Sequence, residues 1–194
     1  MELVLASNSP HKVVEVRRIL HGITIRTPAE CGVRFSFDET GSRYDENALG
    51  KARHLYRLLG VPTLADDSGL AVAALGGAPG VRSARFAPPG KQLDDAGRCA
   101  YLLSLMGSGG DRSAAFICCL ALILDPHRLL LVQEAVTGEI TDRARGSAGF
   151  GYDPIFLLPH LGRTMAELSG QEKDRVSHRG RALRRARRLF AGGA

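Results

Sequence analysis

The sequence contains few of the features that are typical of secreted, membrane-bound or redox-active proteins. Its four cysteines show neither CxxC nor CxxxC spacing, and two of them, Cys118 and Cys119, are adjacent in an apolar stretch. The longest apolar run, residues 114–124, is much shorter than the roughly 20 residues of a membrane-spanning helix. The first residues also lack the basic segment that begins a signal peptide. We therefore expect a soluble, cytoplasmic protein whose cysteines are reduced, buried and chemically inert.

Two common nucleotide-binding motifs are also missing. The chain has no GxxxxGK[ST] sequence, and no GxGxxG follows an expected strand. These absences argue against mononucleotide kinases and dehydrogenases. The chain shows no repeat, low-complexity segment or linker, and its 194 residues with 44% hydrophobic content suit one core of ordinary size. We therefore expect residues 1–194 to form a single domain.

Hydrophobic periodicity and turn residues predict strands that alternate with helices, which is the α/β class. Strands are expected at residues 3–6, 23–26, 61–65, 114–124, 129–136 and 155–158. Helices are expected from Pro10 after an N-cap at Ser9, at residues 45–59, at residues 92–106 and near the C-terminus. The two long strands should pair as an antiparallel hairpin. Residues 76–90 are too rich in glycine and proline to be regular, and they are a candidate lid.

The formal net charge of +6 is concentrated in arginines near the end of the chain. A basic nucleic-acid-binding domain is therefore one alternative for the function. However, Leu183, Ala186, Leu189 and Phe190 recur at helical spacing. We therefore expect an amphipathic terminal helix whose arginines, between residues 184 and 188, face solvent.

Several carboxylates come close together around the segment Ala65–Leu70. Asp66 and Asp67 follow a short apolar strand, and Glu46 and Lys51 lie upstream in the expected second helix. A surface turn would also favour Asp, Ser and Gly. In open α/β sheets, however, ligands bind at the carboxyl ends of strands. The position of these acids after a buried strand therefore predicts a metal ion and a phosphorylated substrate.

The loop Ser7-Asn8-Ser9, between the first strand and the first helix, is a candidate anion site. The free N–H groups and the positive dipole end of a helix N-terminus attract anions, and Lys12 adds a full charge. Phosphate is the natural ligand of such a loop. Many α/β proteins have this junction without using it, so the pattern alone does not decide the function.

Five blocks of the sequence resemble the inosine/xanthosine triphosphate pyrophosphatase family in their order and spacing. They are LASNSPHK (5–12), DENALGKA (45–52), ADDSGLAVAALGGAPGVRSARF (65–86), GFGYDPIF (149–156) and EKDRVSHRG (172–180). The resemblance implies a hydrolase that cleaves non-standard purine nucleoside triphosphates (ITP, dITP and XTP) to the monophosphate and pyrophosphate and so cleanses the nucleotide pool. It also implies an elongated, curved mixed sheet with two lobes and a central cleft. A homodimer is implied as well, with the apolar run 129–132 as a candidate interface.

The same resemblance implies a site that binds Mg²⁺ and a purine nucleotide. Asp67 would be the general base and a metal ligand, and Glu46 and Asp66 would complete the metal ligands, a set of oxygen donors that suits Mg²⁺. Lys12 and Lys51 would stabilise the charge on the phosphates. The other substrate-binding residues implied by the resemblance are Ser7, Asn8, Ser9, Ser68, Phe150, Gly151, Tyr152, Asp153, Lys173, His178 and Arg179.

The residues implied for the base explain how one purine would be preferred over another. Phe150 would stack on the purine, and Lys173, His178 and Arg179 would surround its edge. These side chains are mainly hydrogen-bond donors, which match the 6-keto group of hypoxanthine or xanthine. The 6-amino group of adenine would leave them unpaired, and rejection on such grounds can reach roughly 10⁴.

Two features of the sequence leave alternatives open. Where the family commonly has Asn two positions after the Ser or Thr of the first loop, this chain has Ser9, so we expect weaker phosphate binding rather than lost activity. Ser9-Pro10-His11 also resembles the loop of the Maf-type pyrophosphatases, which act on other modified nucleotides, and this is the second enzymatic hypothesis. Arg85 either contacts phosphates or anchors the lid.

Overall fold

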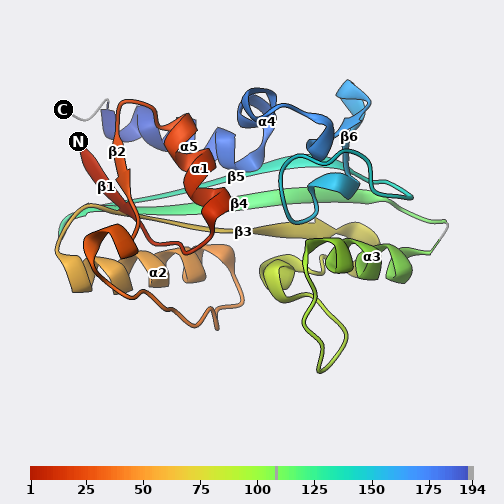
Figure 1. The fold of residues 1–194 in the computed structure, drawn as a ribbon, viewed down its shortest axis with the longest axis horizontal. Coiled ribbons are helices and arrows are strands. Elements are labelled where there is room, and N and C mark those ends of the chain that lie inside the picture. Colours follow the sequence, from red (N-terminus) through yellow and green to blue (C-terminus); the bar gives the residue numbers. More distant parts are fainter. Residues whose placement is uncertain (108, 192–194) are drawn as a thin grey trace. The chain divides into compact units, whose positions relative to one another are not determined.

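The computed structural model describes residues 1–107 and 109–191, and it contains strands and helices in alternation (Figure 1). The helices are α1 (Pro10–Ile19), α2 (Tyr44–Leu59), α3 (Asp95–Met106), α4 (Gly170–Val176) and α5 (His178–Ala191). The strands are β1 (Glu2–Leu5), β2 (Thr24–Arg26), β3 (Thr63–Val72), β4 (Ser113–Asp125), β5 (Arg128–Ile140), β6 (Phe156–Leu158) and β7 (Arg163–Thr164).

The described strands form one mixed sheet with the order β2-β1-β3-β4-β5-β6-β7. β1 pairs in parallel with β2 and with β3, whereas β6 pairs in antiparallel fashion with β5 and with β7. Only Pro126 and His127 separate the neighbouring strands β4 and β5. Such a short connection requires an antiparallel pair. The predicted α/β class and the predicted hairpin are therefore confirmed.

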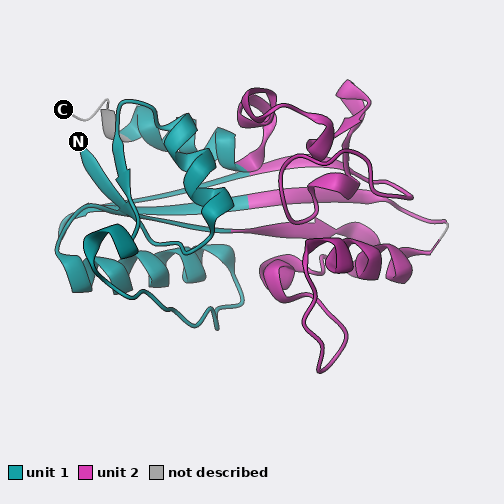
Figure 2. Ribbon diagram, in the orientation of Figure 1, with its two compact units in different colours: residues 1–67, 118–134, 179–194 teal, residues 68–117, 135–178 magenta. Residues whose placement is uncertain are grey.

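The chain folds into two compact units, each built from separate stretches of sequence (Figure 2). Unit 1 contains residues 1–67, residues 118–134 and the chain from Arg179 onward. Unit 2 contains residues 68–117 and 135–178. β3, β4 and β5 each contribute residues to both units. The single domain over residues 1–194 and the central cleft stay predictions.

Unit 1 has helices on both faces of its part of the sheet. On one face, α1 and α5 bury Val13, Val16 and Leu183 against apolar side chains of the strands. On the other face, α2 buries Ala52 and Leu55. Successive side chains of a strand point to opposite faces, so each strand supplies both cores. The strand residues in the two cores include Leu5, Leu64, Cys118 and Leu120 on the first face and Val4, Ala65, Cys119 and Ala121 on the second.

The positions of the cysteines follow from this alternation. Cys118 and Cys119 lie in different cores, as the sequence predicts for adjacent residues of a strand. Cys99 is buried as well. Cys31 is half-buried, so the expectation that all four are buried is wrong for this residue.

The described residues of unit 2 form one core. Leu70 and Val72 of β3 and Phe116 of β4 pack with Leu102 of α3. The segment that contains β6 closes this core with side chains that include Tyr152, Ile155, Phe156 and Leu158. Burial of this apolar row explains why β3 continues seven residues beyond the end expected at residue 65.

Local sequence signals set the ends of the helices. Ser9 is the N-cap of α1, and its hydroxyl accepts the N–H of Lys12, as expected. α3 begins later than expected, because the carboxylate of Asp94 caps it by accepting the N–H of Gly97 at 2.8 Å. The candidate lid is not wholly irregular, since Gly80–Arg85 forms a 3₁₀ helix.

α5 agrees only in part with the predicted amphipathic helix. Leu183 and Ala186 are buried, but the side chain of Leu189 is 50% exposed. The side chain of Phe190 lies outside the described residues. The arginines among residues 184–188 are half-buried or exposed. Within the described ranges, no helix is long and apolar enough to span a membrane.

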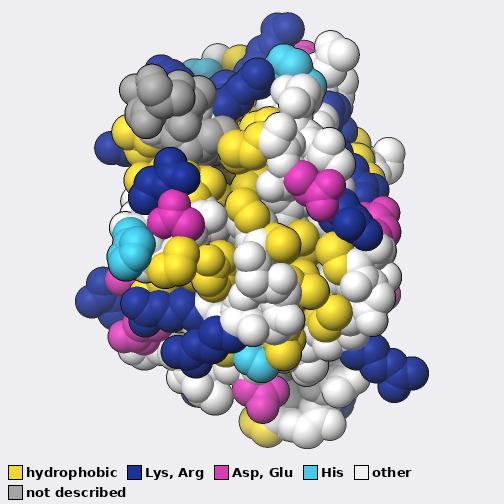
Figure 3. Space-filling model, turned by 90° about the vertical axis from the view of Figure 1, so that its left-hand side faces the viewer, with side chains coloured by type: hydrophobic (Ala, Val, Ile, Leu, Met, Phe, Trp, Pro, Cys, Tyr) yellow, Lys and Arg dark blue, Asp and Glu magenta, His cyan; other side chains and the backbone are white. Residues whose placement is uncertain are grey.

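The surface of unit 1 carries exposed apolar side chains. On the face shown in Figure 3, hydrophobic side chains gather in the middle, and Lys and Arg side chains border them. Leu129 and Leu131 are among the exposed apolar residues of unit 1, whereas Val132 is buried. The run 129–132 is therefore partly accessible, and the homodimer stays a prediction.

Candidate functional site

Asp66 and Asp67 lie inside β3 and not in a turn at its end. The expectation that these acids follow the end of the strand is therefore wrong. Because consecutive residues of a strand point to opposite faces of a sheet, the two adjacent carboxylates meet different partners. Each carboxylate is the centre of a separate group of charged side chains in unit 1.

The first group, which we call the Asp66 network, consists of Lys12, Glu15, Asp66, Cys118 and Arg179. The Asp66 carboxylate accepts hydrogen bonds from the Lys12 ammonium, from Arg179 Nε at 2.8 Å and from the Cys118 thiol at 3.3 Å. Arg179 Nη1 also pairs with Glu15 Oε2 at 2.6 Å. α1, β3, β4 and α5 therefore meet at one buried carboxylate.

The Asp66 network keeps its charges although it is buried. Burial alone would raise the pKa of Asp66, but Arg179 and Lys12 hold it well below its usual value. Burial would lower the pKa of Arg179, but Asp66 and Glu15 raise it. Both oxygens of Asp66 are occupied by protein donors. This geometry suits an anchor for two cations and does not suit a metal ligand.

The second group, the Asp67 cluster, consists of Glu39, Asn47, Lys51 and Asp67. Asp67 Oδ1 lies 3.1 Å from Lys51 Nζ, and Asp67 Oδ2 accepts a hydrogen bond from Asn47 Nδ2 at 3.2 Å. Lys51 Nζ also lies 2.5 Å from Glu39 Oε1 and donates to the carbonyl of Asp66 at 2.8 Å. Asn47 and Lys51 are four residues apart on α2, so they share one face of the helix.

The electrostatics of the Asp67 cluster favour a carboxylate that can take up a proton. Burial raises the pKa of Asp67, Lys51 opposes this shift, and Glu39 adds to it, so that the pKa is raised overall. Burial would lower the pKa of Lys51, but Asp67 and Glu39 raise it. Burial and Asp67 also raise the pKa of Tyr44 to about 12. A carboxylate with a raised pKa is a better general base near neutral pH.

The first loop has the expected helix N-terminus, but its side chains already form hydrogen bonds within the protein. Ser7 Oγ accepts the N–H of Ser9 at 3.1 Å. Asn8 Nδ2 donates to the carbonyl of Phe35 at 2.8 Å. These contacts hold the loop in shape, and the roles of Ser7, Asn8 and Ser9 in substrate binding stay predictions.

A third group of predicted residues, the Phe150 cluster, lies in unit 2 and consists of Phe150, Gly151, Asp153 and Lys173. Lys173 Nζ lies 4.8 Å from the centroid of the Phe150 ring, a cation–π contact, and pairs with the carboxylate of Asp153. Asp153 Oδ2 also accepts the N–H of Phe150 at 2.9 Å. Asp153 and Lys173 are both buried. The Asp153 carboxylate therefore fixes the backbone of Phe150 and the cation above its ring together.

Gly149 precedes this cluster in a backbone conformation that requires glycine. Its φ is +77°, and an added Cβ would lie 2.0 Å from Asp153 Oδ2. Two residues farther on, Gly151 donates its N–H to Asp95 Oδ2 at 2.6 Å. The hydroxyl of Tyr152 donates to the carbonyl of Ser83 at 2.9 Å. The loop is thus held at successive residues.

His178 and Ser68 belong to unit 2 at its junctions with unit 1. His178 is buried, and its ring stacks on Phe116 with a centroid distance of 4.7 Å and an interplanar angle of 12°. Ser68 is half-buried. Ser68 follows Asp67 directly, and Arg179 follows His178 directly. The two units are therefore continuous in the chain at Asp67–Ser68 and at His178–Arg179.

Comparison with known proteins places the chain in a family. The family model described as Ham1 family matches residues 3–189. The chain belongs to the Ham1 family. A relative named dITP/XTP pyrophosphatase, from Treponema denticola, is 44% identical over 193 residues, which are 99% of this chain and 100% of the relative. A second protein with that name, from Ralstonia nicotianae, is 45% identical over 186 residues, with coverage of 93% and 92%.

A solved Ham1 structure has the same fold. The HAM1 protein from Coxiella burnetii matches with a TM-score of 0.88 and 41% identity, and the match covers 100% of both chains. The resemblance to the inosine/xanthosine triphosphate pyrophosphatase family is therefore confirmed. The Maf-type hypothesis and the nucleic-acid-binding hypothesis are not favoured.

Glu46 does not join the carboxylates with which the sequence groups it. In this Ham1 chain its carboxylate accepts the N–H groups of Ser42 at 3.0 Å and Arg43 at 3.2 Å, so it caps the N-terminus of α2. Within residues 1–107 and 109–191, no three His, Cys, Asp or Glu side chains are placed to hold a metal ion. The structure therefore does not bring Glu46, Asp66 and Asp67 together.

Glu39 is a charged residue of the Asp67 cluster that sequence reasoning misses. It precedes α2 in a segment without helix or strand, and its carboxylate contacts the same Lys51 ammonium as Asp67. No periodic signal marks such a position. The only sequence signal is the acidic pair Asp38-Glu39 just before Thr40-Gly41, close to the block that begins α2.

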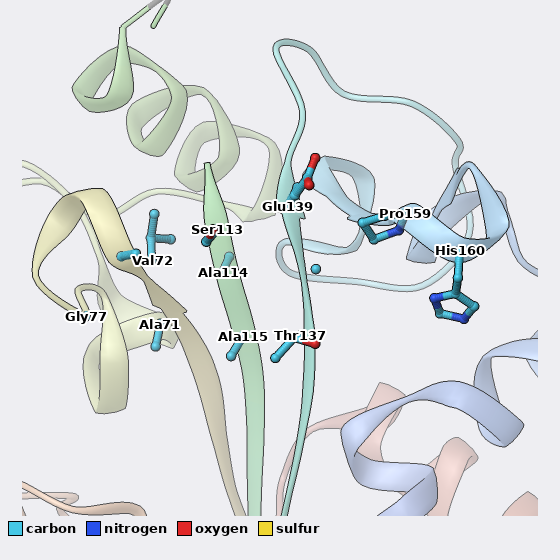
Figure 4. Close-up of a pocket in the computed structure, with 12 residues that line it drawn as sticks. Ala71, Val72, Gly77, Ser113, Ala114, Ala115, Thr137, Glu139, Pro159 and His160 are labelled. Atoms are coloured by element: carbon cyan, nitrogen blue, oxygen red, sulfur yellow. The ribbon is translucent and has the colours of Figure 1, made fainter. Parts of the chain in front are cut away.

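A separate pocket of about 710 Å³ lies in unit 2 of this Ham1 chain (Figure 4). Ala71, Ala115 and Thr137, from the neighbouring strands β3, β4 and β5, line it on one side, and His160 lines it on another. None of the predicted site residues lines the pocket. Its lining consists mostly of small side chains and offers no cluster of catalytic groups.

Proposed function

We propose that this chain hydrolyses non-standard purine nucleoside triphosphates, namely ITP, dITP and XTP, to the monophosphate and pyrophosphate. The observation that carries the proposal is Asp67, a buried carboxylate with a raised pKa that is held by Lys51 and Asn47. The names of the two dITP/XTP pyrophosphatases that are 44% and 45% identical to this chain give the substrate class. Such an enzyme is a hydrolase that acts on acid anhydrides.

In the proposed reaction, Asp67 accepts a proton from a water molecule, and the water oxygen attacks the α-phosphorus. A new phosphorus–oxygen bond forms, the bond from the α-phosphorus to the bridging oxygen breaks, and its electrons leave with pyrophosphate. Lys51 uses its three N–H groups on Glu39, Asp66 and Asp67, whereas the Lys12 ammonium, among the described residues, contacts only Asp66 and keeps an N–H group that can bind a phosphate oxygen. Their positive charges stabilise the negative charge that builds up in the transition state.

Nucleotide pyrophosphatases of this kind generally need a divalent metal ion, and we propose that Mg²⁺ serves here. Glu39 and Asp67 are the residues that would hold the ion. Their two carboxylates contact a single ammonium group, that of Lys51, so negative charge remains for a cation, and carboxylate oxygens are ligands that Mg²⁺ prefers.

Glu46 is not available for this role because it caps α2. Asp66 is not available because each of its oxygens binds a cation, whereas Asp67 Oδ2 accepts from the neutral amide of Asn47. The bound ion would neutralise part of the charge of the triphosphate.

We propose that the Phe150 cluster recognises the base. The Phe150 ring offers a surface on which a purine can stack, and Lys173 offers N–H donors beside it. Donors match a 6-keto group, whereas a 6-amino group would leave them unpaired. His178 would contribute to the same selection, as the resemblance implies, whereas the guanidinium of Arg179 is bound to Asp66 and Glu15.

Asp67→Asn tests the assignment of the general base. The amide has nearly the same shape but cannot take up the proton, so we expect pyrophosphate release from dITP to fall about 10²- to 10⁴-fold. The measurement is the rate of pyrophosphate release with Mg²⁺ present, together with circular dichroism as a check of folding. Asp45→Asn, at an exposed pair with Arg43 in the first turn of α2, is the matched control and should keep full activity.

Two results would contradict the proposal. If Asp67→Asn hydrolysed dITP at the wild-type rate, the mechanism assigned to this carboxylate would be wrong. If the wild-type chain released no pyrophosphate from dITP, ITP or XTP, the substrate class itself would be wrong. The homodimer and the cytoplasmic location stay predictions, and a sedimentation measurement tests the first of them.

A further inference from the structure

Helix α3 holds the loop of the Phe150 cluster by both backbone polar groups of Gly151. The N–H of Gly151 donates to Asp95 Oδ2 at 2.6 Å, and its carbonyl accepts a hydrogen bond from the Cys99 thiol at 3.3 Å. Asp95 and Cys99 are four residues apart on α3, so they face the same side of the helix. One helix face therefore supplies an acceptor and a donor to a single residue of the loop.

We infer that Asp95 is a positioning residue for base selection, which it controls by fixing Gly151 and hence the neighbouring Phe150. This inference rests on the proposed function, because it assumes that Phe150 and Lys173 contact the purine. Asp95 itself need not touch the nucleotide. It sets how accurately the stacking ring and the donor beside it are placed.

The arrangement within α3 explains why the Asp95 carboxylate points to the loop. The N-terminus of α3 is already capped by Asp94, whose carboxylate accepts the N–H of Gly97. Asp95 is therefore not needed as a cap. Its other oxygen, Oδ1, pairs with Arg98, and Arg98 in turn donates to the carbonyl of Leu93 at 2.6 Å. The Asp95 side chain is thus held at one oxygen while the other accepts from Gly151.

The bond between Asp95 and Gly151 limits what Gly151 can do for a ligand. A backbone N–H can donate one strong hydrogen bond, and that of Gly151 donates to a carboxylate at the short distance of 2.6 Å. The N–H of Gly151 is therefore not free to bind the purine. The contribution of Gly151 to recognition is structural, and the base must be recognised by its neighbours.

The thiol of Cys99 acts as the second support. It is buried, and this burial, with the nearby Asp95 and Asp153, raises its pKa to about 12. The thiol therefore stays protonated and can donate to the Gly151 carbonyl. A thiol is a weak donor, so we expect its contribution to be smaller than that of the Asp95 carboxylate.

Other contacts extend the support on both sides of Gly151. The Tyr152 hydroxyl donates to the Ser83 carbonyl, and the Ser83 hydroxyl accepts the N–H of Leu70 at 2.8 Å. On the other side, the Asp153 carboxylate holds the N–H of Phe150. A shift of about 1 Å in such a support can cost roughly 100-fold in rate. The base-recognition loop is therefore expected to be sensitive to the loss of a single anchor.

The experiment measures base discrimination, defined as kcat/KM for dITP divided by kcat/KM for dATP. Asp95→Ala should lower this ratio about 10-fold to 100-fold, with most of the loss for dITP in KM. Asp95→Asn keeps an oxygen that can accept the Gly151 N–H, so it should restore most of the ratio. Cys99→Ala should lower the ratio by only a few-fold.

Asp94→Ala is the matched control for helix stability. It removes the cap of α3 but leaves the contacts of Gly151 in place, so it should lower the melting temperature and keep the ratio. An unchanged ratio in Asp95→Ala would overturn the inference, and so would an equal fall in Asp94→Ala. If Asp95→Ala does not fold, Cys99→Ala decides the matter, and an unchanged ratio in that variant counts against the inference. A wild-type chain that does not hydrolyse dITP would instead refute the proposed function.

Discussion

The charged groups of unit 1 and the Phe150 cluster of unit 2 are held in place in different ways. In unit 1, side chains from separate helices and strands hold one another through ion pairs around Asp66 and Asp67. In unit 2, the backbone of one loop is held by side chains, namely those of Asp153 and Asp95. In the proposed function, phosphate chemistry requires fixed charges and selection of a base requires a fixed shape, and each arrangement would meet one of these requirements.

The two charged groups of unit 1 also differ from each other in net charge. The Asp66 network contains two cations, Lys12 and Arg179, and two carboxylates, Asp66 and Glu15. It is therefore close to neutral. The Asp67 cluster contains one cation and the two carboxylates of Asp67 and Glu39 when both are ionised. Its excess of negative charge favours the binding of a divalent cation.

The largest effect is expected when the Asp66 network is broken. Asp66→Ala leaves the buried Arg179 without its main partner, so we expect a loss of about 3–5 kcal/mol in the free energy of unfolding. Urea unfolding measures this loss. The comparison with Asp67→Asn, which should reduce activity with little loss of stability, separates an anchor from a base. If Asp66→Ala kept the wild-type stability, the structural role assigned to Asp66 would be refuted.

A smaller effect is expected when the loop of unit 2 is strained. Gly149→Ala forces a side chain into a left-handed conformation and against Asp153 Oδ2, so we expect a loss of about 2–3 kcal/mol in the free energy of unfolding and a raised KM for dITP. Gly60→Ala is the matched control in unit 1, because its φ is +66° but nothing lies within 4 Å of the added Cβ. That variant should lose no more than about 1–2 kcal/mol. Equal losses in the two variants would mean that Asp153 does not limit the space at Gly149.

The smallest effect compares two exposed carboxylates, one in each unit. The N–H of Thr27 and the guanidinium of Arg17 lower the pKa of Glu30 from 4.5 to about 2. The guanidinium of Arg163, with Ser169, lowers the pKa of Glu172 from 4.5 to about 2. A pKa that is lower in the folded state means that these groups stabilise the fold above about pH 4.5 and lose this contribution as the pH falls towards about 2.

Glu30→Gln and Glu172→Gln should therefore each reduce the dependence of unfolding stability on pH between about 4.5 and about 2. The measurement is urea unfolding at a series of pH values. The effect should be small because both side chains are exposed to solvent. A wild-type slope in both variants would show that neither contact forms in solution.

Much of the fold could be predicted because its signals are local. Ser9 and Pro10 mark the start of α1, and the two turn residues between β4 and β5 mark the hairpin. The continuation of β3 through Asp66 and Asp67 could not be predicted from these residues, because their composition is typical of a turn. Burial of Leu70 and Val72 in the core of unit 2 outweighs that local preference.

The candidate site was predicted mainly from the resemblance to a family, and its details depend on tertiary contacts. Glu46 and Glu39 are both acidic residues near the start of α2, and nothing in the sequence tells which one approaches Asp67. The structure separates them, because Glu46 binds the N–H groups at its own helix terminus, whereas Glu39 reaches Lys51. Asp95 and Cys99 carry no sequence signal of their role, since they act through the backbone of Gly151.

The way in which the two units share the chain limits how such an enzyme can evolve or be engineered. Neither unit is a continuous stretch of sequence, since unit 1 is interrupted by both segments of unit 2. A single crossover between two homologous genes would therefore exchange parts of both units and could not exchange one whole unit. New substrate preferences in this scaffold are expected to arise by point substitution, with residues such as Asp95 as the accessible positions.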